Sequence, residues 1–330
     1  MKVDYFSLPL SEPLQTAKGP IEDREGYLVT VEEPDIGLGE ATPLPGWTES
    51  LAACKEALES GDPLDELPPA ARHGVSLAAL DAQAKSEGEP LYRFLGGQSA
   101  VESVPVNATV GDADPETTAK QVTAAVDAGF PAVKLKVGAR SIEEDIERVA
   151  AVRDAAPDAE LRLDANGAWT RAEAQEAFDA LTSYGIAYVE QPLPADDLDG
   201  HAALRETVPV ALDEGLYEHG FDAVLDANAA DVWILKPMAM GGPDVAIEAA
   251  GLARGAGIAP VVTTTIDGCV ARAAAVHVAA AIPDVRACGL ATGSLLSVDF
   301  GPDPVPVSNG RIAVPQKEGN IPTTSSADYA

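Results

Sequence analysis

Five short apolar runs between residues 133 and 237 decide the fold: VKLKVG (133–138), LRLDANG (161–167), IAYVEQP (186–192), VPVALDEG (208–215) and VWILKP (232–237). At or near their carboxyl ends lie the charged residues Lys134, Lys136, Asp164, Glu190, Asp213 and Lys236. From Lys136 onward these follow at intervals of 28, 26, 23 and 23 residues, which leaves room for one strand, one helix and two loops per interval. A strand buried on both faces is apolar throughout. A charge at its carboxyl end therefore points into the space that these ends share.

The same rhythm extends on both sides of these runs. Further strands are predicted at 104–110, 259–265 and 285–291, with helices between strands such as 142–156. Eight parallel strands with intervening helices over about 200 residues are typical of a TIM-type barrel. A doubly wound open sheet would need a glycine-rich phosphate turn after its first strand, and VGDADPE has none. The sequence therefore predicts an α/β fold with a (β/α)7β barrel over residues 101–300.

The chain before the barrel predicts a smaller α+β domain over residues 1–100. Residues 1–42 alternate between apolar and polar side chains, as antiparallel strands do. They are interrupted at 14–25 by a polar, glycine-bearing segment that is interpreted as a mobile loop. Two helices are expected at about 48–60 and 69–86, the second from its apolar spacing.

The last segment, 301–330, is expected to return to the first domain. Asn309 and Gly310 lie between two short alternating runs, which indicates a β-hairpin. The polar tail after Asn320 is predicted to be disordered.

The composition describes a globular and strongly acidic protein. Apolar residues make up 46% of the 330 residues, and 53 acidic residues face 22 basic ones, for a net charge of −31. Such a charge repels nucleic acid and anionic membranes, so neither is expected as a partner. An acidic mesophilic enzyme is one interpretation. We favour adaptation to high salt in a halophile, because the acidic residues are spread along the chain and the chain has only nine lysines.

Cysteine usage and the absence of targeting signals favour a cytoplasmic protein. Cys54, Cys269 and Cys288 have no metal-type spacing and are expected as buried thiols in a reducing compartment. The first residues lack the apolar core of a signal peptide, and no apolar run is long enough to span a bilayer. The four histidines fall in predicted helices or loops and are interpreted as structural or exposed.

Three carboxylates follow consecutive predicted strands. Asp164, Glu190 and Asp213 are therefore expected to converge at one end of the barrel. Any one of them alone would fit a salt-bridged or capping acid, but three packed without a cation would repel each other and take up protons. All-oxygen ligation suits a hard cation, and magnesium keeps open positions for water or substrate. The sequence therefore predicts a Mg²⁺ site, with Mn²⁺ as an alternative.

Lysines flank this predicted site. Lys134 and Lys136 are two residues apart on one strand, so both point to the same face, whereas Lys236 arrives from the opposite side of the barrel. A buried lysine beside another cation and a metal loses proton affinity, and its amine can then act as a general base. A metal with bases on both sides suits removal of a proton next to a substrate carboxylate, which produces an enediolate.

Five motifs occur in order along the chain: KLK (134–136), RLDANGAW (162–169), VEQPL (189–193), ALDEG (211–215) and LKP (235–237). In this order they resemble the muconate lactonizing enzyme subgroup of the enolase superfamily, and the similarity covers nearly the whole chain. A lysine on the sixth strand, with no His-Asp pair, argues against the mandelate racemase branch. The resemblance implies that residues 1–100, which include GEATPLPGWTES, form a capping domain whose loop near 15–25 closes over the substrate.

Within the subgroup, RLDANGAW, PLPGWTES and GLATGSLL resemble the o-succinylbenzoate synthases of menaquinone biosynthesis most. The implied reaction is dehydration of a small-molecule carboxylate, 2-succinyl-6-hydroxy-2,4-cyclohexadiene-1-carboxylate, through an enediolate. The resemblance implies that Lys136 removes the α-proton and protonates the departing hydroxyl, that Lys236 stabilises the enediolate, and that Lys134 binds carboxylate and tunes Lys136. It further implies supporting or substrate-binding roles for Arg162, Asn166, Glu214, Thr263, Thr265 and Gly289, although the two threonines also fit ordinary strand positions.

The motifs leave other activities of the subgroup open. Ala291 stands where many relatives have an acid, and ATG (291–293) lacks the Asp-x-Asp pair by which dipeptide epimerases hold the substrate's amino group. Racemases of N-acylamino acids keep the same two lysines, so that alternative remains, as does a muconate cycloisomerase. A non-enzymatic ligand-binding barrel is disfavoured because no expected metal ligand or lysine is missing. A homo-oligomer is also left open.

Overall fold

The first three strands form an antiparallel sheet. The computed structural model describes residues 1–16 and 19–321, and the sheet has the order β1-β2-β3. The strands are β1 (Lys2–Thr16), β2 (Gly19–Val31) and β3 (Gly37–Ala41). The interpretation of residues 14–25 as a loop was wrong for their described part. Strands β1 and β2 continue through this segment, as the pairing of Leu14 with Ile21 and of Thr16 with Gly19 shows.

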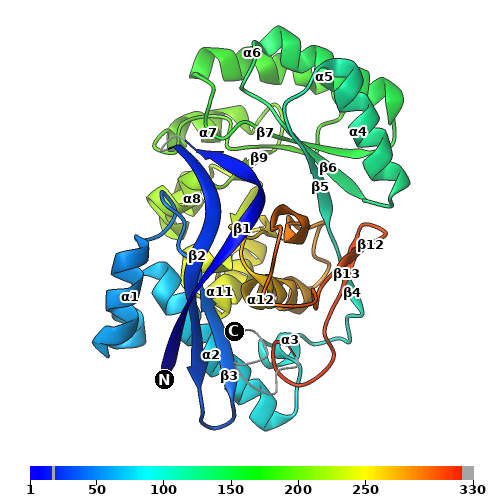
Figure 1. Cartoon of the computed structure of the whole chain (residues 1–330). Helices are drawn as coiled ribbons and strands as arrows, with labels where there is room; N and C mark the ends of the chain where they lie inside the picture. The colour runs from blue at the N-terminus through cyan, green and yellow to red at the C-terminus, as the bar shows by residue number, and fades with distance from the viewer. Residues whose placement is uncertain (17–18, 322–330) are drawn as a thin grey trace.

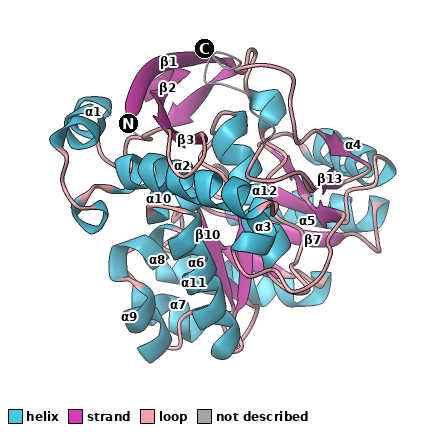
Figure 2. Ribbon diagram, turned by 90° about the horizontal axis from the view of Figure 1, so that it is seen from below, coloured by secondary structure: helices cyan, strands magenta, loops and turns pink. Residues whose placement is uncertain are grey.

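Helix α2 packs across this sheet (Figure 2). The helices of this region are α1 (Leu51–Ser60), the 3₁₀ helix η1 (Leu64–Glu66), α2 (Pro69–Glu87) and α3 (Leu91–Phe94). The two predicted helices are confirmed to within one turn. The contact between α2 and β3 requires glycine, because a Cβ at Gly39 would lie 1.9 Å from the carbonyl oxygen of Gly74.

Seven parallel strands curl into the barrel and pair in sequence order from β5 to β11. They are β5 (Asn107–Val110), β6 (Ala132–Lys136), β7 (Glu160–Asp164), β8 (Tyr188–Glu190), β9 (Val210–Leu212), β10 (Val232–Leu235) and β11 (Ala259–Val262). Figure 1 labels β5, β6, β7 and β9 of this sheet. Lys136 lies opposite Asp164, and Asp164 lies opposite Glu190. The charged strand ends are therefore in register, and the predicted α/β barrel is confirmed.

The eighth strand, predicted at 285–291, is reduced to two isolated bridges. Cys288 pairs with Val106 just before β5, and Gly289 pairs with Thr263 just after β11. These two bridges link the first and last strands of the sheet. Glycine is required where residue 289 approaches its neighbour, because a Cβ there would lie 2.5 Å from Oγ1 of Thr263. The prediction of a full strand was therefore wrong.

Helices follow the strands on the outside of the barrel. They are α4 (Pro115–Asp127), α5 (Ile142–Ala155), α6 (Arg171–Leu181), η2 (Thr182–Tyr184), α7 (Leu198–Leu204), α8 (Glu214–His219), α9 (Phe221–Asp226), α10 (Pro237–Met240), α11 (Pro243–Gly255), α12 (Cys269–Ala281) and η3 (Gly293–Leu295). Capping boxes at Ser141 and Thr170 start α5 and α6. In residues 1–16 and 19–321, none of the helices has the length and apolar character needed to cross a membrane.

The carboxyl-terminal hairpin forms at Asn309 and Gly310, whose φ angles are 49° and 63°. Its strands, β12 (Val307–Ser308) and β13 (Arg311–Ala313), pair with each other, and β13 also pairs with β4 (Ser103–Pro105) at the start of the barrel. The chain then reaches α2, where the Asn320 main-chain nitrogen donates to Asp81 Oδ1 at 2.7 Å. The boundary near residue 100 stays a prediction. The tail was predicted to be disordered after Asn320, but Ile321 is described and buried, and residues 322–330 lie outside the described part.

A buried histidine on α12 contacts the end of this segment. Nε2 of His277 lies 2.7 Å from the carbonyl oxygen of Asn320, and Nδ1 accepts from the main-chain nitrogen of Tyr92 at 3.1 Å. Burial lowers the pKa of His277 to about 4, because desolvation disfavours the charged imidazolium. The side chain is therefore a neutral link between α12, α3 and the terminal segment.

We expect acid to weaken the fold through His277. The unfolded chain takes up this proton near pH 6.5, whereas the folded protein resists it until about pH 4. Stability present above pH 6.5 is therefore lost as the pH falls through 4, by about 3 kcal/mol in total. His277→Gln keeps a donor and an acceptor but cannot take up a proton. Denaturant titrations should show a flatter pH dependence for this variant, and equal slopes in the two proteins would contradict the assignment.

Candidate active site

A pocket of about 550 Å³ opens at the carboxyl ends of the barrel strands, where TIM-type folds carry their active sites. It lies between the barrel and the first domain. The barrel contributes Lys134, Lys136, Asp164, Asn166, Glu190, Asp213, Glu214, Lys236, Thr263, Thr264, Thr265 and Ile266, and the first domain contributes Leu14, Leu44, Pro45 and Trp47. The structure thus gathers Lys134, Lys136, Asp164, Glu190, Asp213 and Lys236, which were singled out in the five apolar runs, around one cavity.

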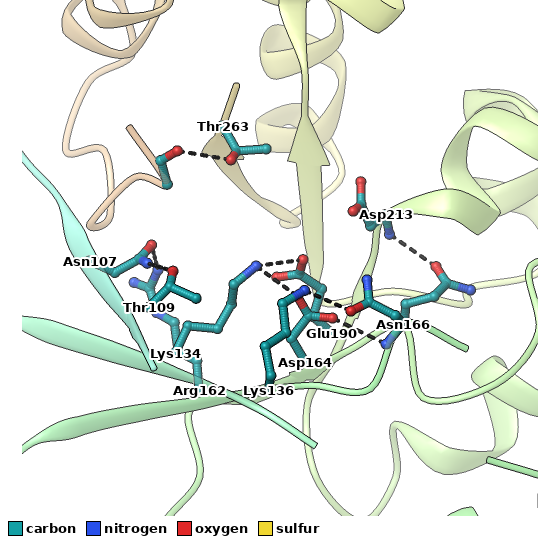
Figure 3. Close-up of polar contacts among 12 residues, drawn as sticks. Asn107, Thr109, Lys134, Lys136, Arg162, Asp164, Asn166, Glu190, Asp213 and Thr263 are labelled. Carbon is teal, nitrogen blue, oxygen red and sulfur yellow. Dashed lines mark hydrogen bonds and ion pairs between the residues drawn. The ribbon is translucent and has the colours of Figure 1, made fainter. Parts of the chain in front are cut away.

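Lys134 and Lys136 both point toward the carboxylates of the next strands (Figure 3). Lys134 Nζ lies 2.9 Å from Asp164 Oδ2 and 2.8 Å from Glu190 Oε1. Lys136 Nζ lies 2.7 Å from the same Asp164 oxygen and donates to Asn166 Oδ1 at 2.6 Å. The two-residue spacing on β6 places both ammonium groups on one face, as the sequence predicts.

Lys236 approaches from β10. Its Nζ lies 2.6 Å from Asp213 Oδ2 and 3.2 Å from the centre of the Trp47 ring, a distance at which the ring face attracts a cation. Tyr217 fixes this corner, because its hydroxyl accepts from the Lys236 main-chain nitrogen at 2.7 Å and its ring meets Trp47 edge to face. Lys236 is therefore held by a carboxylate and an aromatic face at once.

Burial and neighbouring charges shift the pKa values of the three carboxylates in different directions. Burial and repulsion from Asp164 raise the pKa of Glu190 to about 7. Burial also raises the pKa of Asp213, to about 6, against the attraction of Lys236. Burial alone would raise the pKa of Asp164 as well, but the ammonium groups of Lys134 and Lys136 lower it below its ordinary value. Negative charge at Glu190 and Asp213 thus lacks full compensation within the chain.

The donor set fits a hard divalent cation. Oδ1 of Asp213 and Oε2 of Glu214 are buried and have no hydrogen-bond partner in the described structure, which costs free energy unless a ligand satisfies them. Carboxylate oxygens are the ligands that Mg²⁺ prefers. Among the described residues, no group of three acidic, histidine or cysteine side chains is arranged so that it could hold a metal ion. Each predicted ligand instead forms an ion pair with a lysine. The ligand assignment stays a prediction.

The remaining predicted residues divide between the pocket wall and its surroundings. Asn166 joins Lys136 to Glu214, donating to Glu214 Oε1 at 3.3 Å. Thr263 and Thr265 line the pocket, but the Thr263 hydroxyl donates to the carbonyl oxygen of Gly289 and that of Thr265 donates to an aspartate. Gly289 lies beside Thr263 and does not line the cavity.

Arg162 lies inside the barrel rather than in the pocket wall. It is fully buried and donates to the carbonyl oxygen of Ala287 at 2.6 Å and to Glu160 at 2.7 Å. Its guanidinium lies over the Tyr188 ring at 5.1 Å. Arg162 and Asp164 share a face of β7, so Arg162 supports the layer next to the site and does not line the pocket.

The sequence analysis expected the first domain to close over the substrate through the segment near residues 15–25, but it did not identify the residues of this domain that line the pocket. Trp47 follows Gly46, whose φ is 98°, and this turn presents the indole ring to Lys236. A tryptophan directly after a Pro-Gly turn was a signal in the sequence, but nothing in the sequence paired it with a lysine 189 positions later. Leu44 and Pro45 were missed for the same reason. Thr264 and Ile266 flank the predicted Thr265 after β11 in the barrel and were also not predicted.

A family model described as "Enolase C-terminal domain-like" matches residues 117–320. This match covers more than half of the chain, including every strand that carries a predicted site residue. The chain belongs to the enolase superfamily. It is an enzyme of this superfamily, and its relatives have several activities.

Three curated relatives illustrate the range of activities. The hydrophobic dipeptide epimerase of Enterococcus faecalis is 30% identical over 92% of this chain and 91% of its own. The o-succinylbenzoate synthase of Thermobifida fusca is 38% identical over 64% of this chain and 67% of its own. The N-succinyl-L-Arg/Lys racemase of Bacillus cereus is 30% identical over 82% of this chain and 81% of its own.

A solved structure supports the same fold with a metal. The dipeptide epimerase of Enterococcus faecalis, complexed with Mg and the dipeptide L-Leu-L-Tyr, has a TM-score of 0.84 and 29% identity and covers 98% of both chains. The structural neighbours of this chain therefore include a magnesium enzyme that binds a small-molecule substrate.

Proposed function

We propose that the protein is a magnesium-dependent o-succinylbenzoate synthase that dehydrates 2-succinyl-6-hydroxy-2,4-cyclohexadiene-1-carboxylate in menaquinone biosynthesis. The observation that carries the proposal is the difference in environment between Lys136, at the end of β6, and Lys236, directly after β10. The side chain of Lys136 is 39% exposed, whereas that of Lys236 is 10% exposed and held by Asp213 and Trp47. The proposed elimination needs one base that is open to the pocket and one enclosed cation, and this asymmetry fits that requirement.

Lys136 acts as the general base in this proposal. It removes the proton from the carbon next to the substrate carboxylate, which breaks a C–H bond. It then returns that proton to the departing hydroxyl as the C–O bond breaks, so that water leaves and the ring becomes aromatic. Asp164 and Asn166 orient its amine toward the pocket.

The other charged groups hold the substrate carboxylate and the developing negative charge. Lys236 presents a fixed ammonium from the other side of the barrel, and Lys134 provides a second one beside Lys136. Asp164, Glu190 and Asp213 would hold Mg²⁺, which supplies Lewis-acid polarisation of the substrate carboxylate when bound. In this proposal, Asn166 and Glu214 are hydrogen-bonded to each other next to the metal ligands and hold these ligands in position.

The rest of the pocket supports a carboxylate substrate with a largely uncharged body. Leu14, Leu44, Pro45 and Ile266 offer apolar surface, and Trp47 adds an aromatic face. The wall after β11 consists of threonines and Ile266, and among the described lining residues the acidic ones are the four at the ends of β7, β8 and β9. Among the described lining residues after β11 none is acidic, so no carboxylate exposed there would hold an ammonium group, which argues against a dipeptide.

An N-acylamino acid racemase is the second candidate. It is favoured by the same pair of lysines on β6 and β10 and by the similarity to the Bacillus cereus enzyme. A racemase needs both lysines to exchange protons with the substrate, which the enclosed position of Lys236 disfavours. A muconate cycloisomerase and a dipeptide epimerase are further alternatives in the same superfamily.

The direct test is an assay of purified protein with Mg²⁺ and the cyclohexadiene substrate, followed by the absorbance change on aromatisation. We expect turnover that depends on the metal. Racemisation of N-succinyl amino acids without dehydration would overturn the proposal in favour of the racemase. Dipeptides and muconate serve as further substrates in the same series.

We also expect Asp213→Asn to weaken Mg²⁺ binding. Loss of a partner that only orients a ligand costs about 10- to 100-fold in metal affinity, so loss of a ligand should cost at least about 100-fold. Isothermal titration with Mg²⁺ measures this directly. Asp231→Asn is the matched control, because Asp231 is also paired with a cation, Arg205, but precedes β10 at the other end of the barrel. Equal affinity of the Asp213 variant and wild type would contradict the ligand assignment.

A further inference from the structure

Arg24 on β2 is a buried arginine that joins the two walls of the pocket. Its residue exposure is 1%, and it donates to three main-chain carbonyls. Nη2 donates to Thr42 at 3.0 Å, Nη1 to Pro43 at 3.1 Å and Nε to Ile266 at 3.0 Å. Thr42 and Pro43 directly precede the wall that the first domain contributes, whereas Ile266 belongs to the wall contributed by the barrel.

Ile266 has a backbone conformation that its own side chain opposes. Its φ is 62°, in the left-handed region, where a β-branched residue is a genuine outlier. The other described non-glycine residues with positive φ are Asn166, Gln191, Asn228, Asp284 and Asn309, and asparagine and aspartate tolerate this region well. Strain of this kind persists only where the surroundings impose it, and it concentrates at functional sites.

The contacts around Ile266 restrain its neighbours. The main chain and hydroxyl of Thr265 both donate to Asp267, at 3.2 and 2.5 Å. The hydroxyls of Thr264 and Thr292 share a hydrogen bond at 2.9 Å. The carbonyl of Ile266 itself is held by Arg24 across the contact between the first domain and the barrel.

We propose that Arg24 is a positioning residue that holds Ile266 in the left-handed conformation and thereby sets the spacing between the two walls of the substrate pocket. This inference rests on the proposed function only in taking the pocket as the substrate site. The planar guanidinium reaches three carbonyls in fixed directions, which a lysine cannot do. Because its bonds go to main-chain carbonyls, Arg24 acts through the shape of the pocket.

A double-mutant cycle of Arg24→Met and Ile266→Asn tests the proposal. Without Arg24 the strained Ile266 relaxes and the wall moves, so KM should rise by about tenfold or more while kcat changes little. Asparagine adopts the left-handed conformation unaided. In the Ile266→Asn background, the same loss of Arg24 should therefore raise KM much less.

The unfolding free energies of the same four proteins should also be non-additive, but with the opposite sign: the effect of Arg24→Met on stability should be larger in the Ile266→Asn background, whereas its effect on KM should be smaller there. With Ile266 present, loss of the arginine hydrogen bonds is partly offset by relief of strain. In the Ile266→Asn background there is no strain to relieve, so Arg24→Met should lower the denaturant midpoint further. An arginine with a merely structural role would give additive changes in both KM and stability.

Three further variants complete the experiment. Ile266→Val keeps a β-branched side chain, so its cycle with Arg24→Met should resemble that of wild type. Arg24→Lys keeps the charge and should give an intermediate KM. This variant replaces Arg24→Met in the experiment if Arg24→Met does not fold. Arg153→Met removes an arginine bound to the carbonyls of Tyr184 and Ala159, away from the pocket lining, and should lower stability without a change in KM.

The outcomes separate this inference from the proposed function. An unchanged KM in the Arg24 variants, or additive effects in both cycles, would overturn the positioning role. Failure of the proposed function would show instead in wild type, as racemisation without dehydration, and the KM cycle would then be measured with the N-succinyl amino acid. The stability cycle needs no substrate and decides by itself whether Arg24 holds Ile266.

Discussion

Replacing Lys136 by alanine should remove nearly all turnover while Mg²⁺ binding remains. A positioned general base contributes about 10²- to 10⁴-fold to the rate, and kcat should fall by at least that much because Lys136 serves twice in the proposed reaction. The variant is expected to fold, since Asp164 keeps its ion pair with Lys134 at 2.9 Å. Steady-state kinetics and isothermal titration with Mg²⁺ measure the two effects separately.

Lys120→Ala provides the matched control for this loss. Lys120 also forms an ion pair, with Glu116 on α4, but its side chain is 72% exposed and lies outside the pocket lining. Its removal should leave both kcat and metal affinity unchanged. Retained turnover in Lys136→Ala would defeat the assignment of the base, and lost metal binding would point to a role for Lys136 in the metal site itself.

The second large effect is expected from salt. A net charge of −31 on 330 residues favours unfolding through self-repulsion, and the screening length falls from about 10 Å at 0.1 M salt to about 3 Å at 1 M. We therefore expect the thermal midpoint to rise by at least about 10 °C between 0.1 M and multimolar KCl, a gain of several kcal/mol. Calorimetry or circular dichroism over a KCl series measures this.

The cause of the salt effect can be tested with a neutral solute. Sucrose stabilises folded proteins through exclusion from their surface but does not screen charges, so it should not replace KCl for this protein. Stability in dilute buffer equal to that in multimolar KCl would contradict the interpretation as adaptation to high salt. The acidic surface would then be that of a mesophilic protein.

The placement of the charged residues followed from spacing alone. Asp164 and Glu190 end consecutive buried strands, and parallel strands bring their carboxyl ends to one edge. Their approach to Lys134 and Lys136 on β6 was therefore predictable without any tertiary information. Periodicity of this kind is local, because each strand and helix is specified by the residues within it.

Contacts between distant segments were not predictable in this way. Trp47 reaches Lys236, and Arg24 reaches Ile266, from a domain whose position on the barrel depends on the packing of both surfaces. The resemblance implied a supporting or substrate-binding role for Arg162, and the depth of the barrel places it in the layer next to the pocket. The spacing of residues along a strand predicts which face a side chain points to, but it does not predict how deep in the barrel that side chain lies.

By itself, the sequence determined the barrel, the order of its charged strand ends and the convergence of three lysines with three carboxylates. These features depend on strand periodicity and on the parallel direction of neighbouring strands. Only the tertiary structure decided the shortened eighth strand at Gly289, the aromatic face against Lys236 and the strained loop at Ile266. Each of these arises where main chains or side chains far apart in the sequence come into contact, and steric fit between such groups is a property of the packed molecule.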